Sequence, residues 1–374
     1  MSVDVAKPGL EGVIAGETSV CCIDQGKLLF RGYPIDELAD EKILFGEVAY
    51  LLLWGELPTK AELKSLWAML SEFHGLRPEV VDMIRTIPRS APMMSVLRTG
   101  VSMASHFDPA PGQSVEELRR RSVWLLAVAS DVVAARYRLV NGKEPVEPKP
   151  GLSHAAQMLY MFHGTDPDEL STRILDLTLV LYAEHDFNAS TFTNRVIAST
   201  GSDMTSAIVG AIGALKGPLH GGANERAIEL ILQFKSPQEA GKWVREALIR
   251  KERIMGFGHR VYKNGDHRAR ILDVEVRKLA VVKGREDLLA IYDAIMDPIV
   301  NKERPIYPNV DYPCGLLYYL MDLPLDLYTP LFACSRIAGW CAHYIEQNQN
   351  NRIYRPLSKY VGPALRSVAP IESR

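Results

Sequence analysis

The 374-residue sequence lacks the features of a membrane protein, a nucleic-acid-binding protein or a disulfide scaffold. Its longest apolar stretches, residues 50–54 and 177–183, are far shorter than the roughly 20 residues of a membrane span. The 43 basic side chains nearly balance the 45 acidic ones, so no overall field favours nucleic acid or anionic lipid. Its five cysteines follow no zinc or iron–sulfur spacing, and we expect buried, reduced thiols. These absences predict a soluble, cytoplasmic protein with neither a membrane nor a nucleic-acid partner.

What the sequence does contain is typical of a folded globular protein. Hydrophobic residues make up 47% and charged residues 24%, and the length suggests two or three domains. Strand signals are confined mostly to the N-terminal part, where residues 19–23 and 27–30 flank Asp24-Gln25-Gly26. This pattern predicts a small β-hairpin.

Beyond the hairpin the pattern has a helical period. Apolar residues recur at helical spacing over 45–52, and Gly55 follows as a stop signal. Ser114 and Glu117 form a capping-box pattern ahead of another periodic segment. The all-apolar residues 177–183 predict a buried helix, and the Pro- and Gly-rich residues 140–153 predict a loop. We therefore expect a mainly α fold with more than ten helices.

Three segments share one design, in which a tight loop with glycine or proline presents a titratable side chain just before a helix. They are residues 217–226 with His220, 255–270 with His259, and 307–315 with Asp311. Glycines beside such a side chain let the backbone pass close to a ligand. We expect a helix from about Asn224, an N-cap at Asp266, and Asp311 at the start of a helix from Leu316.

Each of these side chains has a structural alternative when it is taken alone. A loop histidine often only hydrogen-bonds to structure, and an aspartate before a helix is an ordinary N-cap. Two histidines and an aspartate could also form a metal triad, but such ligands usually include two that are close in sequence. His220, His259 and Asp311 are 39 and 52 residues apart, which disfavours a metal. Because the same arrangement, a titratable side chain in a tight loop before a helix, occurs three times, we favour a catalytic site.

The segments GPLHGGANE, GFGHRVYKNGDHRA and YPNVDYPCG resemble the three active-site motifs of the citrate synthase family, which includes 2-methylcitrate synthases. Further similar segments are RGYPIDEL, AEHDFNASTFT, SRIAGWCAHYIEQ and NRIYRP, so the resemblance covers nearly the whole chain. It implies a large helical domain from residues 1–220 and 318–374, a smaller inserted helical domain from 221–317, and a homodimer with a shared active site.

The resemblance also implies roles for individual residues. Asp311 would take a methyl proton from acetyl-CoA, His220 would hydrogen-bond the thioester oxygen, and His259 would polarise the carbonyl of the 2-oxo acid. The dicarboxylate would be held by His185, Arg268, Arg336 and Arg355, with Arg355 expected to come from the second subunit. The segment that contacts coenzyme A would be Arg253, Ile254, Met255, Gly256 and Phe257.

The chemistry of these side chains suits the roles. An aspartate is a weak base, so it can deprotonate a thioester only if the enolate oxygen is stabilised at the same moment. A neutral His220 near a helix N-terminus is suited to donate that hydrogen bond. Arginines can bind each carboxylate through two parallel hydrogen bonds. Water must be excluded to protect the thioester, which predicts closure of a small domain carrying His259 and Asp311.

The sequence departs from the family pattern at two places. His267 stands where proline is common, and Pro313-Cys314 replaces a more usual aromatic–serine pair after Asp311. Because these last two residues would lie near the acyl group, the acyl preference stays open.

The expected function is condensation of acetyl-CoA with oxaloacetate and water to give citrate and coenzyme A. The alternatives are 2-methylcitrate synthesis from propionyl-CoA, or a catalytically silent relative that binds coenzyme A. No tightly bound cofactor and no metal is expected, and coenzyme A takes part as the thioester co-substrate.

Overall fold

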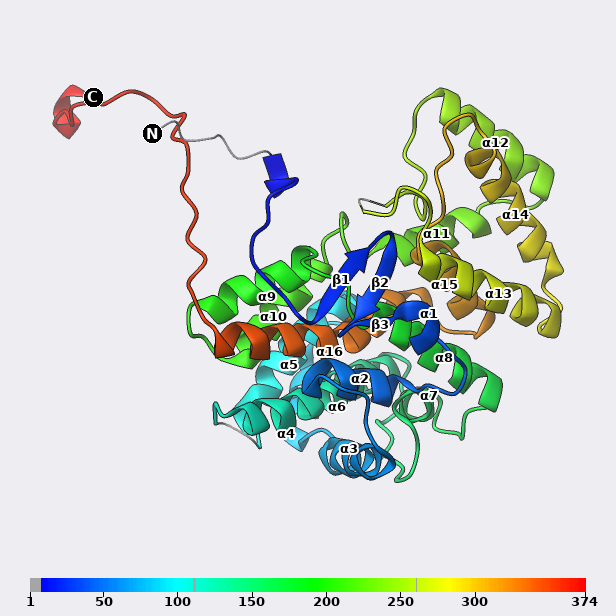
Figure 1. The fold of residues 1–374 in the computed structure, drawn as a ribbon, viewed down its shortest axis with the longest axis horizontal. Coiled ribbons are helices and arrows are strands. Elements are labelled where there is room, and N and C mark those ends of the chain that lie inside the picture. The colour runs from blue at the N-terminus through cyan, green and yellow to red at the C-terminus, as the bar shows by residue number, and fades with distance from the viewer. Residues whose placement is uncertain (1–7, 110–111, 260) are drawn as a thin grey trace.

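A computed structural model describes residues 8–109, 112–259 and 261–374, and this part of the chain forms 16 α-helices and one small sheet (Figure 1). The predicted mainly helical fold is therefore confirmed. Within the described residues, no helix combines the length and apolar character needed to cross a lipid bilayer.

The sheet is antiparallel and has three strands: β1 (Cys21–Asp24), β2 (Lys27–Phe30) and β3 (Tyr33–Pro34). The predicted hairpin is confirmed, except that Asp24 belongs to β1 and pairs with Lys27 instead of lying in the loop. The turn then consists of Gln25 and Gly26, whose φ angles of 47° and 82° suit a two-residue hairpin turn.

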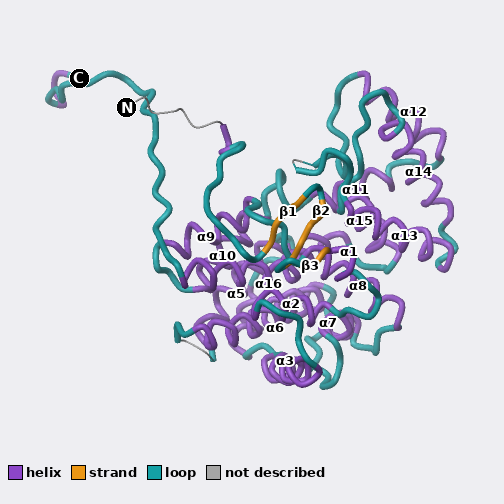
Figure 2. The backbone as a smooth tube through the Cα atoms, viewed as in Figure 1, coloured by secondary structure: helices purple, strands orange, loops and turns teal. Residues whose placement is uncertain are grey.

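Most of the helices surround one long central helix, α16 (Tyr328–Gln349), which packs against α2, α6, α8, α9 and α10 (Figures 1 and 2). Every residue from 328 to 345 is buried, as expected of a helix enclosed on all sides. The helices of this first group that precede α16 are α1 (Ile35–Leu38), α2 (Phe45–Trp54), α3 (Lys60–Phe73), α4 (Pro78–Thr86), α5 (Met93–Ala104), α6 (Val115–Val140), α7 (His154–His163), α8 (Glu169–Tyr182), α9 (Ala189–Ser199) and α10 (Met204–Leu215).

A second group of helices lies to one side of the first (Figure 1). Its members are α11 (Ala223–Leu232), α12 (Pro237–Ile249), α13 (His267–Val282), α14 (Glu286–Val300) and α15 (Asp311–Leu320). Within the group α12 packs on α14, and α15 packs on α11 and α13, while α11 also touches α16 and α13 touches α1 and α8. The predicted domain limits near residues 220 and 318 stay a prediction.

The helix signals in the sequence are largely confirmed. Helix α2 ends at Gly55, whose φ of 101° is left-handed, and Ser114 caps α6 in a capping box with Glu117. The predicted loop separates α6 from α7, and the buried helix predicted over 177–183 is the last part of α8, which ends at Tyr182 and leaves Leu177 only half-buried.

Two local predictions are wrong. Helix α15 begins at Asp311 and not at Leu316, because Pro313 fits the first helical turn, where its missing N–H costs nothing. Cys22 is exposed, whereas the other four cysteines are buried; all five are free thiols.

The C-terminal segment leaves the body of the molecule (Figures 1 and 2). Residues 350–370 form neither helix nor strand, and a short 3₁₀ turn (Ile371–Ser373) follows. Its apolar side chains are largely in solvent: Leu357, Leu365 and Val368 are 80%, 103% and 88% exposed. Exposed apolar side chains that occur together are typical of interaction surfaces.

The close crossing of α16 over the end of α8 depends on Gly339. A Cβ on this residue would stand 2.5 Å from the carbonyl oxygen of Ala183 and would also overlap the carboxylate of Glu184. We expect Gly339→Ala to lower the free energy of unfolding by about 1–3 kcal/mol through overpacking, measured as a lower Tm.

The matched control is Gly241→Ala in α12. A Cβ there would have its nearest neighbours at ordinary contact distance, Arg245 Nη1 at 3.4 Å and Ala294 O at 3.6 Å. This variant should keep its stability or gain slightly, because alanine favours helix more than glycine does. Equal Tm values for the two variants would contradict the crossing argument.

Candidate active site

The second and third loops predicted from the sequence lie side by side and are joined through their backbones. The Gly258 amide donates to the Tyr307 carbonyl at 2.8 Å, and the Asn309 amide donates to the Gly256 carbonyl at 2.9 Å. Both glycines have left-handed φ angles, 85° for Gly256 and 81° for Gly258, which other residues rarely adopt. The pairing brings the titratable side chains of the two loops to one place.

Arg336 is the charge that the predicted site residues share. It lies close enough to contribute to the pKa shifts of His185, His220 and Asp311. The rings of His185 and His259 lie edge to face, with their centroids 5.0 Å apart. Side chains from all three loops therefore converge with those of AEHDFNASTFT and α16.

His259 is a neutral imidazole with its proton on Nε2. Its Nδ1 accepts hydrogen bonds from the amides of Val261 (3.1 Å) and Tyr262 (3.2 Å). An amide can only donate, so Nδ1 carries no proton. Burial lowers the pKa of His259 to about 4, and the charge of Arg268 adds to the effect. At neutral pH this ring can donate one hydrogen bond, from Nε2.

His220 is neutral as well, but its proton lies on the other nitrogen. The Ser190 amide donates to Nε2 of His220 at 3.3 Å, and the Ser190 hydroxyl lies 2.9 Å from the same atom. Burial lowers the pKa of His220 to about 4, and the charge of Arg336 contributes. The N–H of this ring is therefore on Nδ1, three residues before α11 begins.

Asp311 lies in the first turn of α15 and keeps part of its surface accessible. Burial by the surrounding protein raises its pKa to about 6, against a hydrogen bond from the Tyr182 hydroxyl, which donates to Oδ1 at 2.7 Å. A carboxylate with this pKa is a stronger base than a solvated aspartate and is still ionised at neutral pH.

Arg268 is held by a buried carboxylate. Its Nε and Nη2 donate to the two oxygens of Asp266 at 3.0 and 2.8 Å, and both side chains are almost inaccessible. Asp266 also caps α13, as predicted, and accepts the amide of Val310 at 3.2 Å. The ion pair thus connects the second loop to the residue before Asp311.

Arg336 is the second buried arginine of the site and comes from α16. Its Nε donates to the carbonyl of Tyr182 at 2.6 Å, and its guanidinium lies over the ring of Phe332. Burial lowers its pKa to about 10, opposed by the charge of Glu184, so the side chain stays cationic. Two buried cations, Arg268 and Arg336, therefore face one space beside His185, as a dicarboxylate site requires.

Two other sets of predicted residues lie differently. Arg355 is exposed in the C-terminal segment and makes no ion pair with the described residues. In the predicted coenzyme A segment, Arg253 is exposed while Ile254 is buried, and Phe257 packs on Tyr312 with centroids 4.5 Å apart. The segment therefore has one exposed residue, Arg253, and a ring that packs on the residue after Asp311.

Three further residues contact the site and are not predicted from the sequence: Tyr182, Glu184 and Tyr262. Tyr182 lies near the end of an apolar stretch, and that stretch predicts only a buried helix. Tyr262 lies in the second active-site motif, in which only His259 is predicted to be catalytic. Glu184 accepts a hydrogen bond from Nε2 of His343 at 3.1 Å, which is fixed because Arg195 donates to Nδ1 of that ring. Only their neighbours in space reveal these roles.

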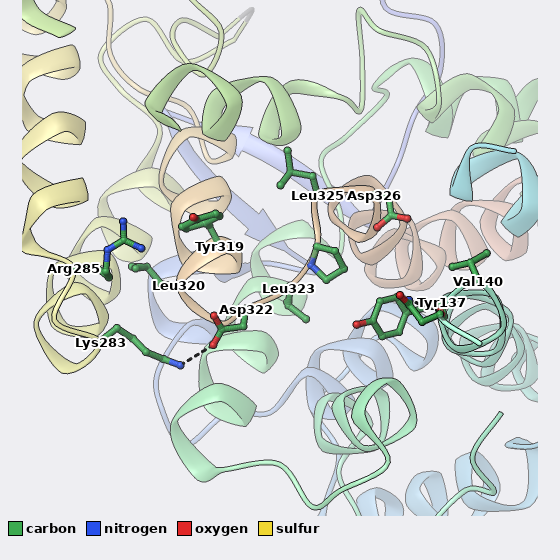
Figure 3. A pocket seen from close by; sticks show the side chains of 12 residues that line it. Tyr137, Val140, Lys283, Arg285, Tyr319, Leu320, Asp322, Leu323, Leu325 and Asp326 are labelled. Atoms are coloured by element: carbon green, nitrogen blue, oxygen red, sulfur yellow. Dashed lines mark hydrogen bonds and ion pairs between the residues drawn. The ribbon is translucent and has the colours of Figure 1, made fainter. Parts of the chain in front are cut away.

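A cavity in the described part of the chain lies away from these residues. It has a volume of about 640 Å³ and lies between the end of α6, the turn from α13 to α14 and the connection from α15 to α16. Figure 3 shows Lys283 and Asp322 paired across it, with nitrogen and oxygen 3.2 Å apart. None of the predicted site residues lines this cavity. The described residues also contain no group of three or more His, Cys, Asp or Glu side chains arranged to hold a metal ion.

Comparison with known proteins gives consistent matches over the whole chain. The family described as "Citrate synthase, C-terminal domain" matches residues 9–357. The chain is 42% identical to 2-methylcitrate synthase 1 of Corynebacterium glutamicum over 100% of both chains. It is 40% identical to citrate/2-methylcitrate synthase of Bacillus subtilis over 95% of this chain and 96% of that one.

A solved structure agrees with these matches. It is described as the ternary complex of carboxymethyl coenzyme A and oxaloacetate with citrate synthase from Thermoplasma acidophilum. It superposes with a TM-score of 0.93 at 34% identity, over 98% of each chain.

The raised pKa of Asp311 predicts how its removal changes stability. The folded protein binds this proton more tightly than the unfolded chain, so the contribution is fully present below pH 4 and is lost as the pH rises through 6. Asp311→Asn should therefore be more stable than the parent at pH 8, by roughly 3 kcal/mol, and the gain should shrink towards pH 5. Denaturant unfolding at both pH values measures the difference.

Asp203→Asn is the matched control. Although burial opposes the shift, hydrogen bonds from Ser206 lower the pKa of Asp203, the N-cap of α10. Its substitution should bring no gain at pH 8. An Asp311→Asn gain that does not grow with pH would contradict the buried-base interpretation.

Proposed function

The chain belongs to the citrate synthase family and is a transferase of that family, and we propose that it condenses acetyl-CoA with oxaloacetate and water to give citrate and free coenzyme A. The observation that carries this proposal is the convergence of a carboxylate whose pKa is raised to about 6 with two neutral imidazoles. Each imidazole has one N–H whose position the surrounding hydrogen bonds fix.

The first step is enolisation of the thioester. Asp311 takes a proton from the acetyl methyl group, and the electrons of that C–H bond move onto the thioester oxygen. The Nδ1–H of His220 donates to this oxygen as its charge develops, so proton removal and charge stabilisation occur together. The buried site strengthens that hydrogen bond because little water competes for it.

The second step forms the carbon–carbon bond. The enol carbon attacks the 2-oxo carbon of oxaloacetate, and the Nε2–H of His259 passes its proton to the carbonyl oxygen. Arg268, Arg336 and His185 hold the two carboxylates meanwhile. Water then cleaves the citryl thioester: its hydroxide adds to the acyl carbon, its proton returns to Nε2 of His259, and the proton held by Asp311 passes to the departing thiolate, which leaves as free coenzyme A.

Coenzyme A is proposed as a co-substrate held by residues 253–257, and the steps above call for no tightly bound cofactor. The exposed Arg253 suits a phosphate, and the apolar Ile254 and Phe257 lead towards the reacting acyl group. We place the enzyme in the cytoplasm, where a reducing environment suits its five free thiols.

Propionyl-CoA is the second candidate acyl donor, with 2-methylcitrate as the product. The names of the two relatives favour it, since one is a 2-methylcitrate synthase and the other carries both names. One methylene changes binding by only about 1–3 kcal/mol, so a single site can accept both donors. The ratio of kcat/KM for acetyl-CoA and propionyl-CoA decides between them.

We further propose a homodimer in which Arg355 of each chain completes the site of the other. The support is the C-terminal segment, which carries Arg355 away from its own body and exposes Leu357, Leu365 and Val368. A second copy is the partner whose surface would cover these apolar side chains and use the nearby guanidinium.

The proposed reaction is tested by release of free thiol with oxaloacetate and either acyl-CoA. The wild type should release coenzyme A only when both substrates are present, and Asp311→Asn should lower kcat by at least about a thousandfold while still binding oxaloacetate. Asp203→Asn should retain full activity. No release with either acyl-CoA would favour the catalytically silent alternative, and near-normal turnover of Asp311→Asn would contradict the base.

Mixed dimers test the shared site. Asp311→Asn and Arg355→Ala should each be nearly inactive alone, the latter through weaker oxaloacetate binding. Co-expressed in equal amounts, they should regain roughly a quarter of wild-type activity, because half of the dimers are mixed and each has one intact site. Activity no higher than that of the single variants would place Arg355 in its own subunit's site, or outside any site.

A further inference from the structure

Tyr262 contacts three of the predicted oxo-acid residues, although neither the motifs nor the mechanism above gives its side chain a role. Its hydroxyl lies 3.1 Å from Nε2 of His185. Its ring stacks on His259 at 4.6 Å between centroids with an angle of 30°, and the Arg268 guanidinium lies 5.8 Å from the ring centre. The side chain is 6% exposed.

The hydroxyl of Tyr262 fixes the position of the proton on His185. Among the described residues, Nε2 of His185 is the only acceptor within reach of this hydroxyl, so the phenol donates and Nε2 accepts. Burial lowers the pKa of His185 well below its usual range, followed by the charge of Arg268, and burial raises that of Tyr262. A neutral His185 that accepts at Nε2 keeps its proton on Nδ1.

The same residue also fixes His259, by a separate part of its structure. The Tyr262 amide donates to Nδ1 of His259, and the phenol ring covers one face of that imidazole. The rings of His185 and Tyr262 meet at 88°, so one phenol contacts both imidazoles. A phenylalanine would keep the amide and the ring but lose the hydroxyl.

We propose that Tyr262 is a positioning residue for the 2-oxo dicarboxylate, whose hydroxyl holds the neutral His185 ring in place beside the two arginines of the dicarboxylate site. Its ring and amide hold His259 in the orientation that presents Nε2–H to the carbonyl. This inference rests on the proposed function for the identity of the ligand. The hydroxyl of Tyr262 therefore contributes to substrate binding, and its ring contributes to the chemical step.

Tyr262→Phe tests the hydroxyl. We expect the KM for oxaloacetate to rise about tenfold, kcat to stay within about threefold, and the KM for acyl-CoA to stay unchanged. The control is Tyr344→Phe, which removes a buried hydroxyl that donates to the Ser202 carbonyl at 2.8 Å, away from the site. This control should leave both kinetic constants unchanged.

A double-mutant cycle tests whether the hydroxyl acts through His185. In a His185→Asn background, Tyr262→Phe should cause no further loss of oxaloacetate binding, measured by calorimetric titration. Tyr262→Leu, which also removes the ring, should lower kcat beyond the effect of Tyr262→Phe.

An oxaloacetate KM that stays at the wild-type value in Tyr262→Phe would overturn the inference, and so would an undiminished effect in the His185→Asn background. A lower Tm with no separation of KM from kcat would show a merely structural tyrosine and would also overturn it. If the wild type releases no coenzyme A, the proposed function fails. The titration needs no turnover, so it still decides the role of Tyr262.

Discussion

The buried ion pair between Asp266 and Arg268 is the interaction on which the candidate site depends. Asp266 accepts four hydrogen bonds, from the amide, Nε and Nη2 of Arg268 and from the amide of Val310. One carboxylate therefore caps α13, balances a buried guanidinium and fixes the backbone next to Asp311. Removing either partner would leave an unpaired charge in the interior and would lower the free energy of unfolding by about 3–5 kcal/mol. The loops that carry His259 and Asp311 therefore depend on the same ion pair for their positions.

Around this pair, burial drives each titratable group towards its neutral form, and the consequences differ with the type of group. Burial and the nearby arginines lower the pKa values of His220 and His259, so both rings remain neutral donors at physiological pH. The same withdrawal from water raises the pKa of Asp311 and makes it a stronger base. One environment thus supplies two hydrogen-bond donors and a proton acceptor without a charged imidazole.

The two groups of helices contribute different parts of the site. The first group supplies His185 and Arg336, and the second supplies Arg268, His259 and Asp311. Tyr182 bridges them, because it ends α8, its carbonyl accepts from Arg336 and its hydroxyl donates to Asp311. The distance from His185 and Arg336 to Asp311 therefore depends on how the two groups of helices pack. A relative motion of the two groups would change that distance and so affect catalysis.

The sequence by itself determined the helical fold, its caps and the three loops, because helical period, Ser114 with Glu117, and glycines in strained turns are local signals. It misplaced the start of α15, since Pro313 indicates a loop as readily as a first helical turn. Only the tertiary structure decided where each imidazole proton lies and which tyrosine hydroxyls reach Asp311 and His185. Those properties depend on donors and acceptors that are distant along the chain and become neighbours only when the helices pack.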